Sequence, residues 1–174
     1  MDLAAAGQQG LATMNIFVLS LVPREAAESH CDKHVVKMIL ETAQLLYCAH
    51  WMTNPENVPA TAYRKTHVNH PCSVWAREST ENYQWLAELG LCLCREYTFR
   101  YGKTHKTEAH LTWLATNLPP LPGVGRTPFR MAMPDEFKCD DPVLAYQAYY
   151  LGAKERLLTF SKRPPPPFVE KKRV

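Results

Sequence analysis

The fold is decided by residues 31–44, which read CDKHVVKMILETAQ. The segment mixes ionisable side chains into an otherwise apolar stretch. Drawn as a helix, it repeats at three and four residues, so His30, His34, Lys37 and Glu41 share one stripe and aliphatic residues form another. One face should therefore lie in a core. The polar face has two interpretations. Lys37 and Glu41 are a solvated ion pair, or the imidazoles, amine and carboxylate together form an acid/base site.

Helical periodicity extends on both sides of this segment, from about residue 24 to residue 50. Pro23 stands where a helix can start, and a break is expected within residues 29–32. Before it, residues 14–19 (MNIFVL) read as a short buried strand or extended segment. The first part of the chain is therefore an apolar segment followed by two helices in line.

Prolines, capping residues and glycines predict further helix boundaries. They are a start at Asn69-His70-Pro71, a second start at Ser79 or Thr80, an end at Gly102, a short helix from Thr104 or Thr107 to Leu118, and a last helix from Asp140 or Asp141 to about Phe160. Residues 119–134 are rich in Pro and Gly and should form a long irregular loop. The fold class expected is mainly α, a compact single-domain helical bundle. We expect residues 1–13 to be a flexible extension, 14–160 the helical domain, and 161–174 a Pro-rich basic tail with no core to join.

Composition narrows the class of protein. A chain of 174 residues with 46% hydrophobic residues can bury one core. It lacks a window of about 18 apolar residues, and its start lacks the apolar run of a signal peptide, so we expect a soluble intracellular protein without a membrane partner. Six cysteines without Cys-x-x-Cys spacing should be reduced thiols. Metal-binding and nucleotide-cofactor motifs are absent from the sequence, so no metal and no cofactor are expected.

Although the net charge is only +3, basic residues are concentrated in two clusters, residues 63–77 and 95–106. The first surrounds a predicted helix N-terminus, which favours an anion such as phosphate. The second mixes cations with aromatic residues, as nucleic-acid contacts do, although its tyrosines suit a core equally well. The candidate phosphate contacts are Arg64, His67, His70, Arg77, Arg100 and Lys103. The alternative is a capped helix whose basic residues are simply solvated.

Four motifs point to a family. They are MNIFV at 14–18, DKHVVKMILETAQLL at 32–46, NHPCSVWAR at 69–77 and YTFRYGKTH at 97–105. With them the chain resembles phage and giant-virus proteins described as pyrimidine-dimer DNA glycosylases of the endonuclease V type. The resemblance covers about residues 14–160. It implies a compact helical enzyme of DNA repair whose partner is duplex DNA with a damaged or flipped base, acting in the host-cell cytoplasm if the protein is viral.

The resemblance also implies a mechanism. An α-amine of the chain attacks C1′ of the damaged nucleotide, a carboxylate assists, and the resulting Schiff base permits strand cleavage by elimination, which is a glycosylase/AP lyase reaction. Met14 would supply that amine in a chain that begins there. His34, Lys37 and Glu41 would form the acid/base group, and the basic residues listed above would contact phosphate and sugar. Trp75 or the 119–134 loop could wall a pocket for the flipped base.

Two other interpretations stay open from the residues. One is an enzyme of nucleotide or thymine-base modification on the same scaffold, with Lys37 as a side-chain nucleophile. The other is a non-catalytic DNA-binding or virion-associated protein, in which only the basic clusters matter.

Overall fold

A computed structural model of the chain describes residues 14–174. Its α-helices are α1 (Pro23–Ser29), α2 (Asp32–Thr53), α3 (Pro71–Ala76), α4 (Thr80–Tyr101), α5 (Glu108–Thr116), α6 (Pro142–Ala153) and α7 (Pro167–Arg173). Three short 3-10 helices, η1 (Pro55–Asn57), η2 (Asp135–Phe137) and η3 (Glu155–Leu157), lie between them. Within residues 14–174 no segment forms a β-strand. The mainly α fold class is confirmed, while the expected flexible extension at 1–13 lies outside the described residues.

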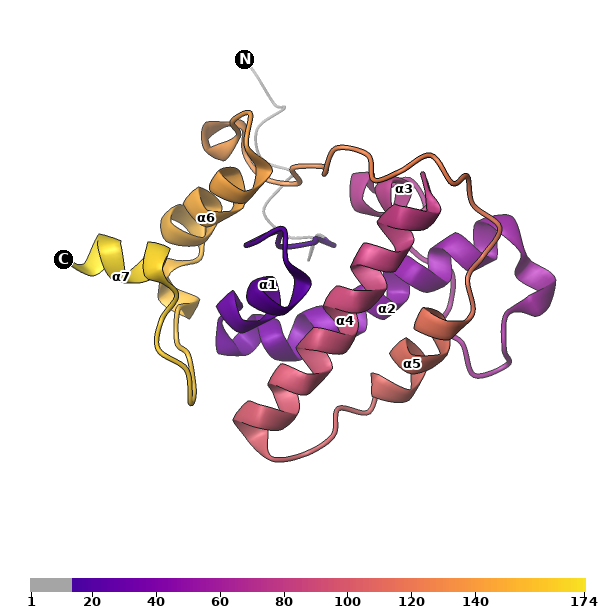
Figure 1. Cartoon of the computed structure of the whole chain (residues 1–174), viewed down its shortest axis with the longest axis horizontal. Helices are drawn as coiled ribbons and strands as arrows, with labels where there is room; N and C mark the ends of the chain where they lie inside the picture. The colour runs from indigo at the N-terminus through magenta and orange to yellow at the C-terminus, as the bar shows by residue number, and fades with distance from the viewer. Residues whose placement is uncertain (1–13) are drawn as a thin grey trace, which may run out of the picture.

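The long helices α2 and α4 run antiparallel through the centre of the molecule, and α1, α3 and α5 pack around them (Figure 1). At one end the His50 ring bonds the Tyr83 hydroxyl across 2.9 Å. At the other end Arg100 reaches Asp32. Contacts at both ends therefore fix the orientation of α2 against α4, and with it the face of α2 that is exposed to solvent.

Local signals placed the helix starts correctly. Proline occupies the first turn of α1, α3 and α6. The Ser79 hydroxyl accepts from the Asn82 amide and caps α4, and Gly102 ends it in a left-handed conformation with φ of 68°. The expected break is confirmed, since α1 ends at Ser29 and α2 begins at Asp32. For α3 the capping side chain is His70, whose ring accepts from the Cys72 amide.

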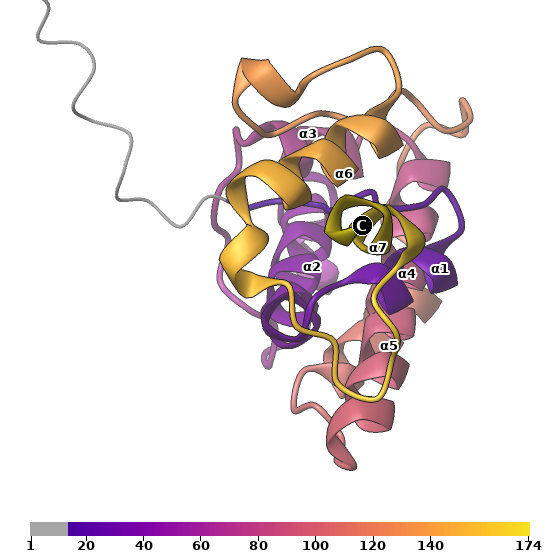
Figure 2. The same cartoon turned by 90° about the vertical axis from the view of Figure 1, so that its left-hand side faces the viewer.

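Residues 14–19 form an extended segment whose side chains are buried. Phe17 stacks on His34 of α2 with centroids 4.4 Å apart, and it also stacks on Tyr149 of α6 at 6.2 Å. Figure 2 shows this segment passing between α2 and α6. The start of the described chain is therefore held inside the molecule.

The Pro-rich tail differs from its sequence-based expectation, because it does join the core. Val169 of α7 is only 1% exposed, and α7 packs on α6. Arg163 binds the Glu96 carboxylate through two nitrogens, at 2.9 and 3.0 Å. Helix α6 also stops at Ala153, and the turn η3 then leads the chain toward the tail.

Candidate functional site

Glu41 lies on α2 in an unusual setting. The residue is 6% exposed, and its Oε1 lies 3.4 Å from the Lys37 ammonium. Its other oxygen, Oε2, is buried without a hydrogen-bond partner among the described residues. Burial raises the pKa of the carboxyl, against the opposing pull of Lys37, the Asn15 backbone N–H and His67. A carboxyl with a raised pKa and an oxygen that no other described residue bonds is a candidate for proton transfer.

The Asn15 backbone N–H that faces Glu41 belongs to the peptide that joins Met14 to Asn15. Met14 is 3% exposed. The Asn15 side chain is anchored on both ends: its amide donates to the Ala132 carbonyl at 2.9 Å, and its oxygen accepts from the Tyr146 hydroxyl at 2.8 Å. The Met14–Asn15 peptide and the Lys37 ammonium thus both lie beside the Glu41 carboxyl, whereas His34, the fourth residue expected in this group, packs elsewhere.

Asn15 and Tyr146 are the residues that sequence reasoning missed. Their positions are 131 residues apart, so no local pattern connects them. One signal was present, because Asn15 is the polar residue inside the apolar run at 14–19. A buried amide requires partners, and its presence there marks a position that the fold must satisfy.

His34 is separated from the acid/base pair by its packing. Its ring stacks on Phe17, and its Nδ1 meets the Tyr150 hydroxyl at 2.6 Å. Burial lowers its pKa to about 3, with smaller contributions from nearby cations. A ring that stays neutral and bonded at neutral pH is a poor proton shuttle, so the geometry gives His34 the role of holding Phe17 and Tyr150 against α2.

His67 and His70 lie in the turn before α3, on the Glu41 side of the molecule. His67 is exposed and adopts a positive φ of 51°, which is uncommon for a residue with a side chain and recurs at functional sites. Its Nδ1 bonds the Thr66 hydroxyl at 2.7 Å. The Nδ1 of His70 accepts from the Cys72 amide at 3.1 Å, so only its other nitrogen is free for a ligand. Burial and the neighbouring His67 lower the pKa of His70.

Three of the remaining candidates differ in exposure. Arg64 and Lys103 are exposed, on the loop before α3 and in the turn after α4. Arg77 is half-buried, and its guanidinium lies 3.8 Å from the Cys48 sulfur. The structure therefore leaves Arg64 and Lys103 open to a phosphate and Arg77 partly so.

Arg100 does not fit the phosphate contact expected of it. Its side chain is 0% exposed and pairs with Glu96 at 2.8 Å and with Asp32 at 3.0 Å. A third bond runs to the Glu28 carbonyl at 3.0 Å. The buried guanidinium joins α1, α2 and α4, and we leave it out of the site. Sequence could not reveal this, because Asp32 is 68 residues away.

Trp75 also has a core position. It is 0% exposed, stacks on Phe129 and donates to the Thr127 carbonyl. It therefore cannot wall an open pocket. The 119–134 loop that covers it runs on to Ala132, where it meets Asn15.

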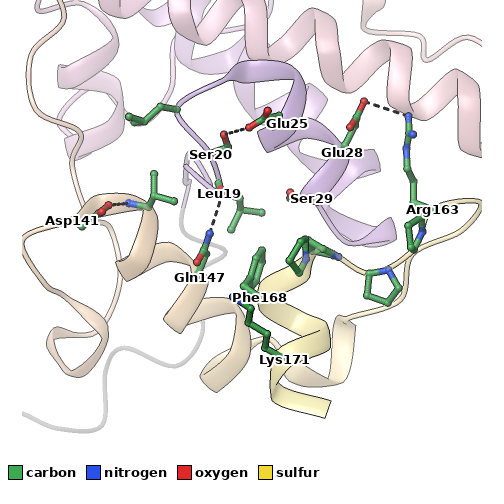
Figure 3. Close-up of a pocket in the computed structure, with 16 residues that line it drawn as sticks. Leu19, Ser20, Glu25, Glu28, Ser29, Asp141, Gln147, Arg163, Phe168 and Lys171 are labelled. Carbon is green, nitrogen blue, oxygen red and sulfur yellow. Dashed lines mark hydrogen bonds and ion pairs between the residues drawn. The ribbon is translucent and has the colours of Figure 1, made fainter. Parts of the chain in front are cut away.

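A groove of about 1040 Å³ lies elsewhere, between α1, α6 and the Pro-rich tail (Figure 3). It is crossed by ion pairs and hydrogen bonds, including Glu28 to Arg163 and Gln147 to Leu19. None of the site residues expected from sequence line it. Within the described part of the chain, no three His, Cys, Asp or Glu side chains gather in a way that could hold a metal. None of the helices there is long and apolar enough to cross a membrane.

Comparison with known proteins bears on this geometry. The sequence model of a family described as "Pyrimidine dimer DNA glycosylase" matches residues 14–109. That span begins at Met14 and includes Lys37, Glu41 and the turn before α3. Comparisons with curated proteins and with solved structures gave no match. The matched span is more than half of the chain's 174 residues, and the chain belongs to the pyrimidine dimer DNA glycosylase family.

Proposed function

We propose that the protein is a DNA glycosylase and AP lyase that cleaves the glycosidic bond of a dimerised pyrimidine through a Schiff base on an amine, with Glu41 as the assisting carboxyl. The observation that carries the proposal is the Glu41 carboxyl, buried beside the Met14–Asn15 peptide with one oxygen that has no hydrogen-bond partner within residues 14–174. Family membership supports the substrate class, which is DNA containing a pyrimidine dimer.

The nucleophile in this proposal is the α-amine of Met14 in a chain that begins at that residue. An α-amine has an ordinary pKa of about 8, so a sizeable fraction is unprotonated near neutral pH. Attack on C1′ forms a carbon–nitrogen bond and breaks the C1′–N1 glycosidic bond, and the departing base nitrogen takes up a proton from water. Glu41 accepts the proton that the amine loses and returns it as the sugar ring opens. The imine then acidifies the C2′ hydrogen, and elimination breaks the 3′ phosphate bond.

Lys37 is a second candidate nucleophile, because its Nζ lies 3.4 Å from the Glu41 oxygen and its side chain is 53% exposed. In this alternative the same carboxyl serves a side-chain amine, and the reaction does not depend on where the chain begins. Arg64, His67, His70, Arg77 and Lys103 are proposed as phosphate and sugar contacts in both cases.

Borohydride trapping distinguishes these routes. The chain as printed and a chain that begins at Met14 would each be incubated with a duplex that contains an abasic site, reduced with borohydride, and the adduct mapped by mass spectrometry. We expect an adduct on the Met14 amine in the shorter chain, retained in Lys37→Arg. An adduct that maps to Lys37 and disappears in Lys37→Arg supports the second candidate.

Glu41→Gln tests the carboxyl itself. It keeps the size of the side chain, and we expect trapping to slow by about a hundredfold to ten-thousandfold. Glu56→Gln is the matched control, since Glu56 is an exposed glutamate just beyond α2. The absence of any adduct from both chains would overturn the Schiff-base proposal.

A further inference from the structure

Two large apolar side chains of α2 face solvent one helical turn apart. Val36 is 40% exposed and Leu40 is 37% exposed. Single exposed aliphatic residues are ordinary on protein surfaces. This pair is distinguished by its position, because Leu40 directly precedes Glu41 in the chain and Lys37 directly follows Val36.

Helical geometry orders these residues around α2. At about 100° per residue, the sequence around the helix runs from Val36 through Leu40 and Lys37 to Glu41. Glu41 lies at the edge where the helix turns inward toward Asn15. On the α2 side, a substrate bound over the Glu41 carboxyl would therefore lie across Lys37 and Leu40.

Cations border the apolar pair on both sides. Lys33 and Lys37 are exposed on α2 itself. On the far side, the turn after α4 carries exposed Lys103 and Lys106 and lies beside α2, since the His105 ring faces the Val36 backbone. An apolar ridge between lysines is complementary to a nucleic-acid groove, where phosphates flank the stacked bases.

We propose that Val36 and Leu40 form a wedge that enters the DNA beside the pyrimidine dimer and fills the gap left in the base stack. The inference rests on the proposed function, because it places the substrate by its approach to Glu41. Extracting a nucleotide from the stack costs base–base contact, and an inserted aliphatic side chain replaces part of it. Lys33, Lys37, Lys103 and Lys106 hold the backbones on either side.

The test separates unstacking from chemistry. Duplex DNA that carries a thymine dimer next to 2-aminopurine reports unstacking as a rise in fluorescence when the full chain binds. Single-stranded DNA with an abasic site reports the Schiff base by borohydride trapping, with no stack to open. The variants are Leu40→Ala and Val36→Ala. Met52→Ala is the control, because Met52 is 44% exposed on the last turn of the same helix, far from Glu41.

We expect Leu40→Ala to abolish most of the fluorescence rise and to slow reaction on the dimer duplex by about tenfold, while trapping on the single strand stays within about twofold. Val36→Ala should show a smaller loss, and Met52→Ala none. All three positions are exposed, and helical circular dichroism verifies their folding.

An unchanged fluorescence rise in Leu40→Ala would overturn the wedge. An equal loss on single-stranded and duplex DNA would also overturn it, because Leu40 would then support the site itself. If the parent chain gives the fluorescence rise but no adduct forms with any DNA, the proposed chemistry fails and the wedge stands.

Discussion

Replacing His34 with asparagine should make the protein less stable at neutral pH and more stable in acid. The folded protein holds His34 neutral, with a pKa of about 3 against an ordinary 6.5. Below about pH 6.5 the unfolded chain takes up this proton and the folded chain does not. The stability associated with a neutral His34 is thus fully present above 6.5 and is lost as the pH falls toward 3.

The proton linkage of His34 and the packing of its ring change the free energy of unfolding in opposite directions in the variant. At about pH 4.5 the proton linkage lowers the free energy of unfolding of the parent chain by about 2.7 kcal/mol, from about 1.36 kcal/mol for each pH unit below the ordinary value. Asparagine keeps a polar atom near the Tyr150 hydroxyl but loses the ring stacked on Phe17. That loss should cost about 1–2 kcal/mol at every pH. The variant should therefore become the more stable protein below about pH 5.5.

Urea unfolding, followed by the fluorescence of the buried tryptophans at a series of pH values, measures this crossover. His67→Asn is the control, because it removes an exposed histidine and asparagine accepts the positive φ at that position. A constant difference between His34→Asn and the parent at all pH values would refute the reasoning. His34→Asn should also form the borohydride-trapped adduct with abasic DNA at nearly the parent rate at neutral pH. A hundredfold loss of that rate would show that His34 is an acid/base group after all.

Further predictions concern the carboxyl, the buried ion network and helix packing. Because burial raises the pKa of Glu41, the stability cost of its ionised form grows as the pH rises above the ordinary carboxyl value of 4.5, and Glu41→Gln should raise the melting temperature more at pH 8 than at pH 4. An equal gain at both would contradict it. Arg100→Met should lower the free energy of unfolding in urea by about 3–5 kcal/mol, because it leaves the buried Glu96 carboxylate with one cation fewer. Gly90→Val should cost about 1–3 kcal/mol in the same assay, since a Cβ at residue 90 would lie 2.8 Å from Leu111 Cδ2. A neutral result would mean that α4 and α5 can separate.

Local chemistry explains which parts of the fold were predictable. A proline at a first turn, a serine cap and a glycine in the left-handed region act within four residues, so the starts of α1, α3, α4 and α6 follow from sequence alone. The stripe of α2 likewise follows from periodicity, and Lys37 and Glu41 do lie side by side.

Partners that are distant in sequence explain the rest. The periodicity of α4 marks Glu96 and Arg100 as neighbours, but it cannot show that Asp32 and Arg163 complete their network. In the structure those partners bury the charges of Glu96 and Arg100. In the sequence alone, the same two residues are typical of a solvated helix end. The tail was misjudged for the same reason, since the apolar face of a seven-residue helix is visible only once α6 lies beneath it.

The geometry of the site depends on the part of the chain that follows the family match. The match ends at residue 109, whereas the Asn15 amide is held by Ala132 and Tyr146 and the His34 ring by Tyr150. These contacts fix the extended segment against α2, and the segment in turn sets where the Met14–Asn15 peptide meets Glu41. Residues up to 109 therefore carry the proposed reacting groups, and the 119–134 loop with α6 supplies the contacts that hold the extended segment beside them. A catalytic carboxyl must be positioned to within about half an ångström. Helices α2 and α4 alone would not impose that accuracy on an extended segment that pairs with no strand.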